Sequence, residues 1–191
     1  MHLTSFSPFA CLSLPVPTNL LCAHRDLVHL KQTFGITHLH YDTVPPYGGD
    51  ILWASGYLAY CKLSPAFREF IDGKKAVMRS GDSYIDENNP EAGRQPVTEI
   101  HPIVRVHPVT GWKCLFVNAN WVVSILGLEK AESDMVIKYL VSVYENNADI
   151  QCRLHWTPGT SAIWDNRYVY LGRHFINDST RQNANQHDLS S

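Results

Sequence analysis

The stretch SAIWDNRYVYLGRH spans residues 161–174. Residues 161–171 are rich in β-branched and aromatic side chains and follow the turn pair Pro158-Gly159, so they predict a strand. The stretch ends on His174, and imidazole is one of the commonest metal ligands in proteins. The stretch therefore predicts a strand that runs towards a candidate metal site, for which other segments must supply the remaining ligands.

Helix signals occur in three other segments. Residues 64–73 carry a complete set of boundary signals, which are Ser64 at the N-cap, Pro65 at the first helical position and Gly73 just past the end. Residues 128–147 predict the longest helix, because apolar residues recur there at three- and four-residue spacing: Val136, Tyr139, Leu140 and Val143. Residues 52–63 predict a short helix over the core.

Strand signals flank these helices. Residues 36–44 alternate and predict a strand, and residues 152–156 predict another. Residues 101–118 predict a β-hairpin that turns at Val109-Thr110-Gly111, whereas the polar residues 79–99 predict a long surface loop. Short strands mixed with a few helices favour one α+β domain built on a β-sandwich or barrel.

Composition excludes several classes of function. The chain has 191 residues, with 16 Lys+Arg against 18 Asp+Glu, and this balance argues against a nucleic-acid-binding surface. No apolar run is long enough for a membrane-spanning helix. The five cysteines are widely spaced without a CxxC pair, so we expect reduced thiols in a cytoplasmic protein rather than a cysteine zinc site.

Histidine pairs offer candidate metal ligands. His24 and Asp26 are two residues apart, so on an extended segment they share a face and, with one more histidine, could form the two-His-one-carboxylate triad of Fe(II) enzymes. His38 and His40 form a second same-face pair, which is either a ligand pair or, as we prefer, two strand histidines packed or hydrogen-bonded on the sheet. His101 and His107 each precede a proline, and we expect both at strand edges with their polar tips at the surface.

A zinc-dependent hydrolase is another function that the candidate ligands leave open. Its metal site would be built on His24, Asp26 and His174.

Four motifs in one order carry a family resemblance. They are GGDILWASGY (48–57), LSPAFREFIDG (63–73), HPIVRVHPVTGWKCLFVN (101–118) and PGTSAIWDNR (158–167). Together they resemble the TauD/TfdA family of Fe(II)- and 2-oxoglutarate-dependent dioxygenases, especially its fungal taurine and sulfonate members. The resemblance implies a double-stranded β-helix (a cupin-like jelly roll) with flanking helices, here incomplete. It also implies Fe(II) as cofactor, 2-oxoglutarate and O₂ as cosubstrates, and hydroxylation of a small organic substrate such as a sulfonate.

The resemblance assigns roles to individual residues. His24 and Asp26 match the first two iron ligands, with Ala23 where the family has tryptophan. The third ligand falls by count on Leu171, and His174 lies three residues further as a substitute. Trp164 and Arg181 are the residues assigned to the cosubstrate, the arginine as its carboxylate anchor. A family threonine that helps hold 2-oxoglutarate is replaced here by Ile51, which cannot donate a hydrogen bond.

The chain is expected to comprise an irregular lead-in (1–22), a dioxygenase domain (23–176) and a flexible polar tail (177–191). The departures at both ends leave activity open. One hypothesis is an active dioxygenase, and the alternative is a catalytically inactive remnant or mis-spliced fragment that acts at most as a binding module. We expect a small-molecule substrate and neither nucleic acid nor membrane as partner, and the sequence leaves open whether copies of the chain form a homo-oligomer.

Overall fold

The computed structural model describes residues 28–44, 48–80, 96–173 and 184–189. The strands are β1 (Ile36–Tyr41), β2 (Ile51–Ser55), β3 (Lys75–Arg79), β4 (Thr98–Pro102), β5 (Val104–Val106), β6 (Lys113–Leu115), β7 (Val122–Ile125), β8 (Gln151–Leu154), β9 (Thr160–Asp165), β10 (Val169–Arg173) and β11 (Ala184–Leu189). The helices are α1 (Gly56–Lys62), α2 (Pro65–Ile71), α3 (Lys130–Glu145) and a 3₁₀ turn, η2 (Ala148–Ile150). None of the helices in these ranges is long and apolar enough to cross a membrane.

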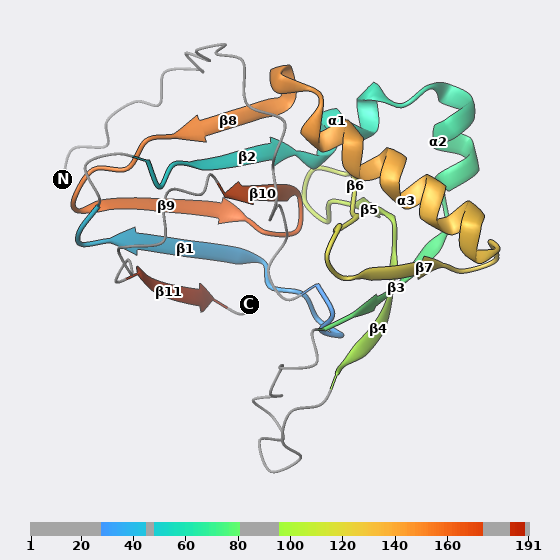
Figure 1. Ribbon diagram of the computed structural model, residues 1–191, viewed down its shortest axis with the longest axis horizontal. Coiled ribbons are helices and arrows are strands. Elements are labelled where there is room, and N and C mark those ends of the chain that lie inside the picture. The colour runs from blue at the N-terminus through green and yellow to red at the C-terminus, as the bar shows by residue number, and fades with distance from the viewer. Residues whose placement is uncertain (1–27, 45–47, 81–95, 174–183, 190–191) are drawn as a thin grey trace.

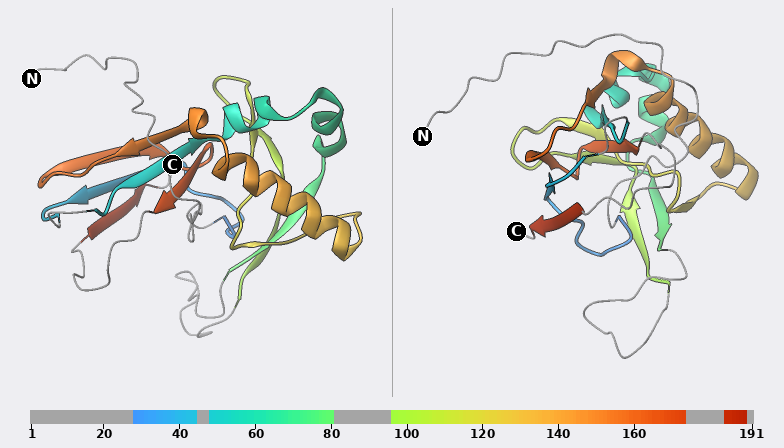
Figure 2. Two further views of the ribbon diagram at one scale, coloured as in Figure 1. Left: turned by 45° about the horizontal axis from the view of Figure 1, so that its top comes forward. Right: turned by 60° about the vertical axis from the view of Figure 1, so that its left-hand side comes forward.

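Two three-stranded antiparallel sheets form one part of the molecule, with strand orders β11-β1-β9 and β10-β2-β8. Figures 1 and 2 show these strands gathered at one side and the helices at the other. An apolar cluster joins the two sheets, because it draws residues from strands of both: Leu39, Tyr41, Ile51, Trp156, Trp164 and Leu171. Burial of these large side chains is the main force that holds one sheet on the other.

A second cluster lies on the other face of the β10-β2-β8 sheet. Ala54 of β2 and Tyr170 of β10 alternate with residues of the first cluster and pack towards α3, which contributes Leu140, Val143 and Tyr144. The same cluster reaches the third sheet, of order β4-β3-β7, through β3 and β7. The central strand β2 is therefore covered on both faces, which explains why it is almost continuously apolar, whereas β8 at the sheet edge is largely exposed.

Local signals determine the helix ends. Ser64 caps α2 by accepting a hydrogen bond from the backbone N–H of Phe67 at 3.3 Å, with Pro65 at the first helical position, as the sequence predicts. Helix α3 begins with a capping box in which the Glu132 carboxylate accepts from the backbone N–H of Glu129 at 3.0 Å. Strands β5 and β6 pair antiparallel around residues 107–112, so the predicted hairpin is confirmed.

Four elements differ from what the sequence predicts. The predicted helix over 52–63 is wrong in its first half, where β2 lies between β8 and β10, and only residues 56–62 are helical. The predicted strand over 161–171 is two strands, because the chain passes from β9 in one sheet to β10 in the other. Strand β3 lies where no element was expected, and residues 184–189 of the expected flexible tail form β11, paired with β1.

Replacing Ser133 with alanine should lower the free energy of unfolding by about 1–3 kcal/mol, because the Ser133 hydroxyl accepts from the buried backbone N–H of Ile125 at 2.7 Å. Urea denaturation measures the change. The control is Ser142→Ala in the same helix, whose hydroxyl donates to the Tyr139 carbonyl one turn back and should cost less than about 0.5 kcal/mol. Equal effects of the two substitutions would contradict this role of Ser133.

Candidate functional site

The crossing from β9 to β10 is a tight polar turn. The Arg167 side chain forms a bidentate pair with the Asp165 carboxylate, with distances of 2.9 Å from Nε to Oδ1 and 2.8 Å from Nη2 to Oδ2. The backbone N–H of Arg167 donates to the same carboxylate at 3.0 Å, and this pairing raises the pKa of the guanidinium. Two backbone hydrogen bonds fasten the turn to its surroundings, from Asn166 to Gly35 and from Gly56 to Tyr168.

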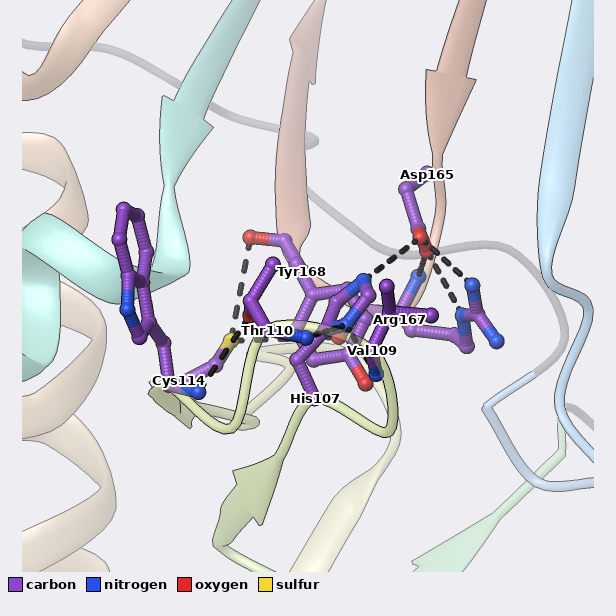
Figure 3. A network of polar contacts seen from close by, with 8 residues as sticks. His107, Val109, Thr110, Cys114, Asp165, Arg167 and Tyr168 are labelled. Atoms are coloured by element: carbon purple, nitrogen blue, oxygen red, sulfur yellow. Dashed lines mark hydrogen bonds and ion pairs between the residues drawn. The ribbon is translucent and has the colours of Figure 1, made fainter.

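The loop of the β5–β6 hairpin lies against this crossing. Figure 3 shows His107 and Arg167 both directed at the Asp165 carboxylate. The Nδ1 atom of His107 accepts from the backbone N–H groups of Val109 and Thr110 at 3.0 and 3.1 Å, so the ring carries its proton on Nε2, which lies 3.6 Å from Asp165 Oδ2. One imidazole thus orders the hairpin loop and connects it to the crossing.

Aromatic stacking strengthens this contact. The rings of His107 and Tyr168 have centroids 4.2 Å apart, and Tyr57 of α1 stacks on Tyr168 at 5.2 Å with an interplanar angle of 6°. Burial raises the pKa of both tyrosines, which keeps their hydroxyls protonated. Hairpin, helix α1 and crossing therefore form one packed unit at the N-terminal end of β10.

The space between the two sheets is lined by three tryptophans. Ring centroids of Trp53 and Trp164 lie 5.5 Å apart, those of Trp53 and Trp156 lie 6.4 Å apart, and Tyr41 meets Trp156 edge-on at 4.6 Å. Within the described residues, the three indole N–H groups have no hydrogen-bond acceptor, and neither has the Thr37 hydroxyl a partner. Because buried donors are normally paired, this layer can offer hydrogen bonds to a bound acceptor such as a carboxylate.

Leu171 and Ile51 lie in this same layer. The side chain of Leu171 is 4% exposed, and that of Ile51 is 2% exposed. On β2, Trp53 is the residue opposite Leu171, and Ile51 is opposite Arg173. The two positions that the sequence assigns to an iron ligand and to a cosubstrate contact are therefore brought together, and both now carry aliphatic side chains without a lone pair.

Of the site residues predicted from the sequence, the structure describes Trp164 alone. His24, Asp26, His174 and Arg181 lie outside the described residues, whereas Trp164 is buried between the sheets with its indole in the tryptophan layer. Within the described ranges, no group of three or more His, Cys, Asp or Glu residues could hold a metal ion. The described residues thus contain buried indole donors without a partner among them, but no group of three or more metal ligands.

The remaining histidines have structural surroundings. His40 contacts the Ser161 hydroxyl at 2.7 Å and the Asp42 carboxylate at 3.1 Å on the outer face of β1, which agrees with the preferred interpretation for this residue of the pair. The expectation for His101 is wrong. Its ring is buried against Phe116 and donates to the Leu30 carbonyl at 2.8 Å, because β4 packs inward at this point.

The expectation for His107 is also wrong, since its side chain is only 12% exposed. Sequence reasoning missed a further buried group, the carboxylate of Asp50, which receives hydrogen bonds from Arg153 at 2.5 Å and from His155 at 2.8 Å. These contacts fix the start of β2 on the end of β8. An acidic residue between two glycines and an apolar strand was the available signal, because a charge beside a buried strand needs partners.

Comparison with known proteins identifies the family. Residues 13–175 match the model of the family described as "Taurine catabolism dioxygenase TauD, TfdA family". The chain belongs to the TauD/TfdA family. Among curated proteins, it is 38% identical over 149 residues to a putative alpha-ketoglutarate-dependent sulfonate dioxygenase of Schizosaccharomyces pombe, an alignment that covers 76% of this chain and 38% of that protein.

Two further relatives of this TauD/TfdA chain are informative. The alpha-ketoglutarate-dependent sulfonate dioxygenase of Saccharomyces cerevisiae is 35% identical over 149 residues, covering 76% of this chain and 36% of that protein. The crystal structure of a taurine dioxygenase from Burkholderia xenovorans matches with a TM-score of 0.72 and 30% identity, covering 84% of this chain and 52% of the other. The chain therefore spans less than half the length of the two curated yeast relatives, from Schizosaccharomyces pombe and Saccharomyces cerevisiae.

Replacing His107 with phenylalanine should lower the free energy of unfolding by about 1–3 kcal/mol, because the ring is kept while two backbone N–H groups lose their acceptor. Urea denaturation measures the loss. The matched control is His40→Phe on the outer face of β1, where solvent can replace the lost contacts and we expect less than about 1 kcal/mol. A His107 variant as stable as the control would show that the hairpin loop does not depend on this ring.

Acid should destabilise the protein through its buried histidines. Burial lowers the pKa of His101 and of His29 from 6.5, with Arg105 adding to the effect at His101. In the unfolded chain these imidazoles protonate first, so their contribution to stability is complete above pH 6.5 and is lost as the pH falls below it. As the pH falls from 7.5, urea denaturation should show a smaller loss of unfolding free energy for His101→Phe than for the unchanged protein. An identical loss would show that His101 does not contribute to the acid sensitivity.

Proposed function

We propose that the chain is the core of an Fe(II)- and 2-oxoglutarate-dependent dioxygenase that hydroxylates a small organic substrate with O₂, of the sulfonate class that includes taurine. Membership of the TauD/TfdA family carries this proposal. The names of its relatives support the sulfonate class, since the fungal relatives are named as sulfonate dioxygenases. A jelly-roll architecture and a cytoplasmic location belong to the same proposal.

Each part of this proposal assigns roles to residues. His24 and Asp26 are proposed as the first two iron ligands and His174 as the third, with Arg181 as the anchor of a 2-oxoglutarate carboxylate. When bound, iron and cosubstrate supply the oxidising chemistry. The described residues contribute the tryptophan layer, which includes Trp164. This layer forms a wall that excludes water, and its indole N–H donors have no partner among the described residues.

One observation favours a second candidate function. Leu171 and Ile51 are the positions that the family resemblance assigns to a metal ligand and to a cosubstrate contact, and both pack in the apolar cluster between the sheets. An apolar filling of this kind does not hold a metal ion or an anion by itself. The alternative is therefore a non-catalytic member of the family that retains the scaffold and binds at most a small carboxylate-bearing molecule through the indole donors.

Anaerobic addition of Fe(II) and 2-oxoglutarate to the folded protein distinguishes the two candidates. The dioxygenase proposal expects a metal-to-ligand charge-transfer absorption band in the unchanged protein and its loss in His174→Ala. Circular dichroism confirms that each variant is folded. Absence of the band from the folded, unchanged protein would contradict the dioxygenase proposal for this chain.

A second pair of variants tests the alternative. Leu171→His places an imidazole at the counted ligand position, and Leu171→Phe is the matched control because it adds a ring without a lone pair. If the chain has lost only this ligand, the band should appear in Leu171→His and stay absent from the unchanged protein and from Leu171→Phe. Burying an imidazole between the sheets should also cost about 1–3 kcal/mol of stability in the absence of metal, which urea denaturation measures.

A further inference from the structure

Two histidines occupy opposite positions on the outer face of the β11-β1-β9 sheet. In the antiparallel pair of β1 and β11, His38 is the Cα partner of His187. Leu39 and Tyr41 of β1 point into the apolar cluster between the sheets, so His38 stands on the opposite, outer face. Opposite residues of an antiparallel pair share one face of the sheet, and the register therefore puts His187 on the outer face as well. Figure 1 shows β11 beside β1 at the edge of this sheet.

The ring of His38 is free to take a ligand. Its side chain is partly exposed, and its Cα partner on β9 is the exposed apolar residue Ile163. Among the described residues, no hydrogen bond or ion pair engages the His38 imidazole. The ring of His40 differs, because its two nitrogens contact the Ser161 hydroxyl and the Asp42 carboxylate. Of the two histidines of β1, His38 is therefore the one that can offer a nitrogen lone pair.

The spacing of opposite strand residues suits a shared metal ion. Directly opposite residues of an antiparallel pair have Cβ atoms about 4.5–5.5 Å apart. Two imidazoles that bind one ion at about 2.0–2.1 Å hold their ligating nitrogens roughly 3 Å apart, a separation that rotation about the side-chain bonds reaches from opposite positions. Imidazole suits zinc, copper and nickel, whereas magnesium and calcium prefer oxygen ligands. The pair therefore favours an ion of the zinc class.

The coordination of such an ion would be open. In the part of the chain that the structure describes, no group of three or more His, Cys, Asp or Glu residues could hold a metal ion. Two imidazoles fill half of the four positions that zinc commonly uses. Water molecules would take the others, so the ion would exchange with the solvent instead of being locked into the fold.

We propose that His38 and His187 bind one divalent transition-metal ion of the zinc class across β1 and β11, with water as the remaining ligands. Strand β11 lies at the edge of its sheet, with β1 as its neighbour, so the ion joins an edge strand to the sheet. The site is separate from the proposed iron ligands His24, Asp26 and His174 and does not depend on the proposed dioxygenase function.

Titration of the full chain with zinc chloride at about pH 7.5, where free imidazole is mostly neutral, tests the site by ¹H–¹⁵N NMR of the histidine rings. We expect saturable shifts at both His38 and His187. His38→Ala should remove the shift at His187, and His187→Ala should remove the shift at His38. Each substitution should weaken zinc binding by about tenfold or more, because one of two protein ligands is lost.

Amide hydrogen exchange tests the link between the ion and the edge strand. If the site exists only while β11 is paired with β1, free zinc at ten times its Kd should slow the exchange of the β11 backbone amides by about tenfold. In His38→Ala, the same zinc concentration should leave the exchange of these amides unchanged. Zinc-independent exchange of the β11 amides in the unchanged protein would overturn the proposal.

His155→Gln is the matched control, because it removes an exposed imidazole outside the β11-β1-β9 sheet. This variant should bind zinc like the unchanged protein, and circular dichroism confirms that each variant is folded. A shift at His187 that persists in His38→Ala, or an equal loss of binding in His155→Gln, would contradict the site. Zinc shifts confined to His24 and His174 would also contradict it, while leaving the dioxygenase proposal intact.

Discussion

The tryptophan layer between the two sheets is the interaction on which the rest of the structure depends. Trp53 lies roughly 100 residues from Trp156 and Trp164 in the chain, and it meets them only when β1 and β9 in one sheet face β2 and β10 in the other. Each indole buries more apolar surface than any aliphatic side chain, so this contact dominates the free energy of sheet packing. Among the described residues, their indole N–H groups have no acceptor, so the packing of the layer rests on apolar contact rather than on hydrogen bonds.

A polar shell fixes the geometry around this apolar layer. The Asp165–Arg167 pair holds the crossing between the sheets, and His107 brings the β5–β6 hairpin against it. At the opposite end, the buried Asp50 carboxylate anchors β2 to β8 through Arg153. The buried Asp50 carboxylate in particular adds specificity of position, because it must keep its partners to avoid the cost of desolvation. Inside this shell, Ile51 and Leu171 are both aliphatic and both belong to the apolar cluster between the sheets.

Much of the local structure was predictable. The caps of α2, the extent of α3 and the β5–β6 hairpin depend on residues close in sequence, so their signals are complete within a short window. The prediction of a helix over the whole of 52–63 failed because the strand state of β2 depends on pairing with β8 and β10, which are about 100 residues away. His101 and His107 were expected at the surface because a single sequence does not reveal which strands pack over them.

The sequence by itself determined the family, through four motifs in one order, and the mismatch between the count to Leu171 and the position of His174. Both follow from residue identity and spacing, which need no coordinates. Only the tertiary structure decided that Ile51 and Leu171 share one apolar cluster, that His107 connects a hairpin to the sheet crossing, and that the buried Asp50 carboxylate joins β2 to β8. These facts depend on contacts between distant segments, and burial and charge pairing arise only when folding brings those segments together.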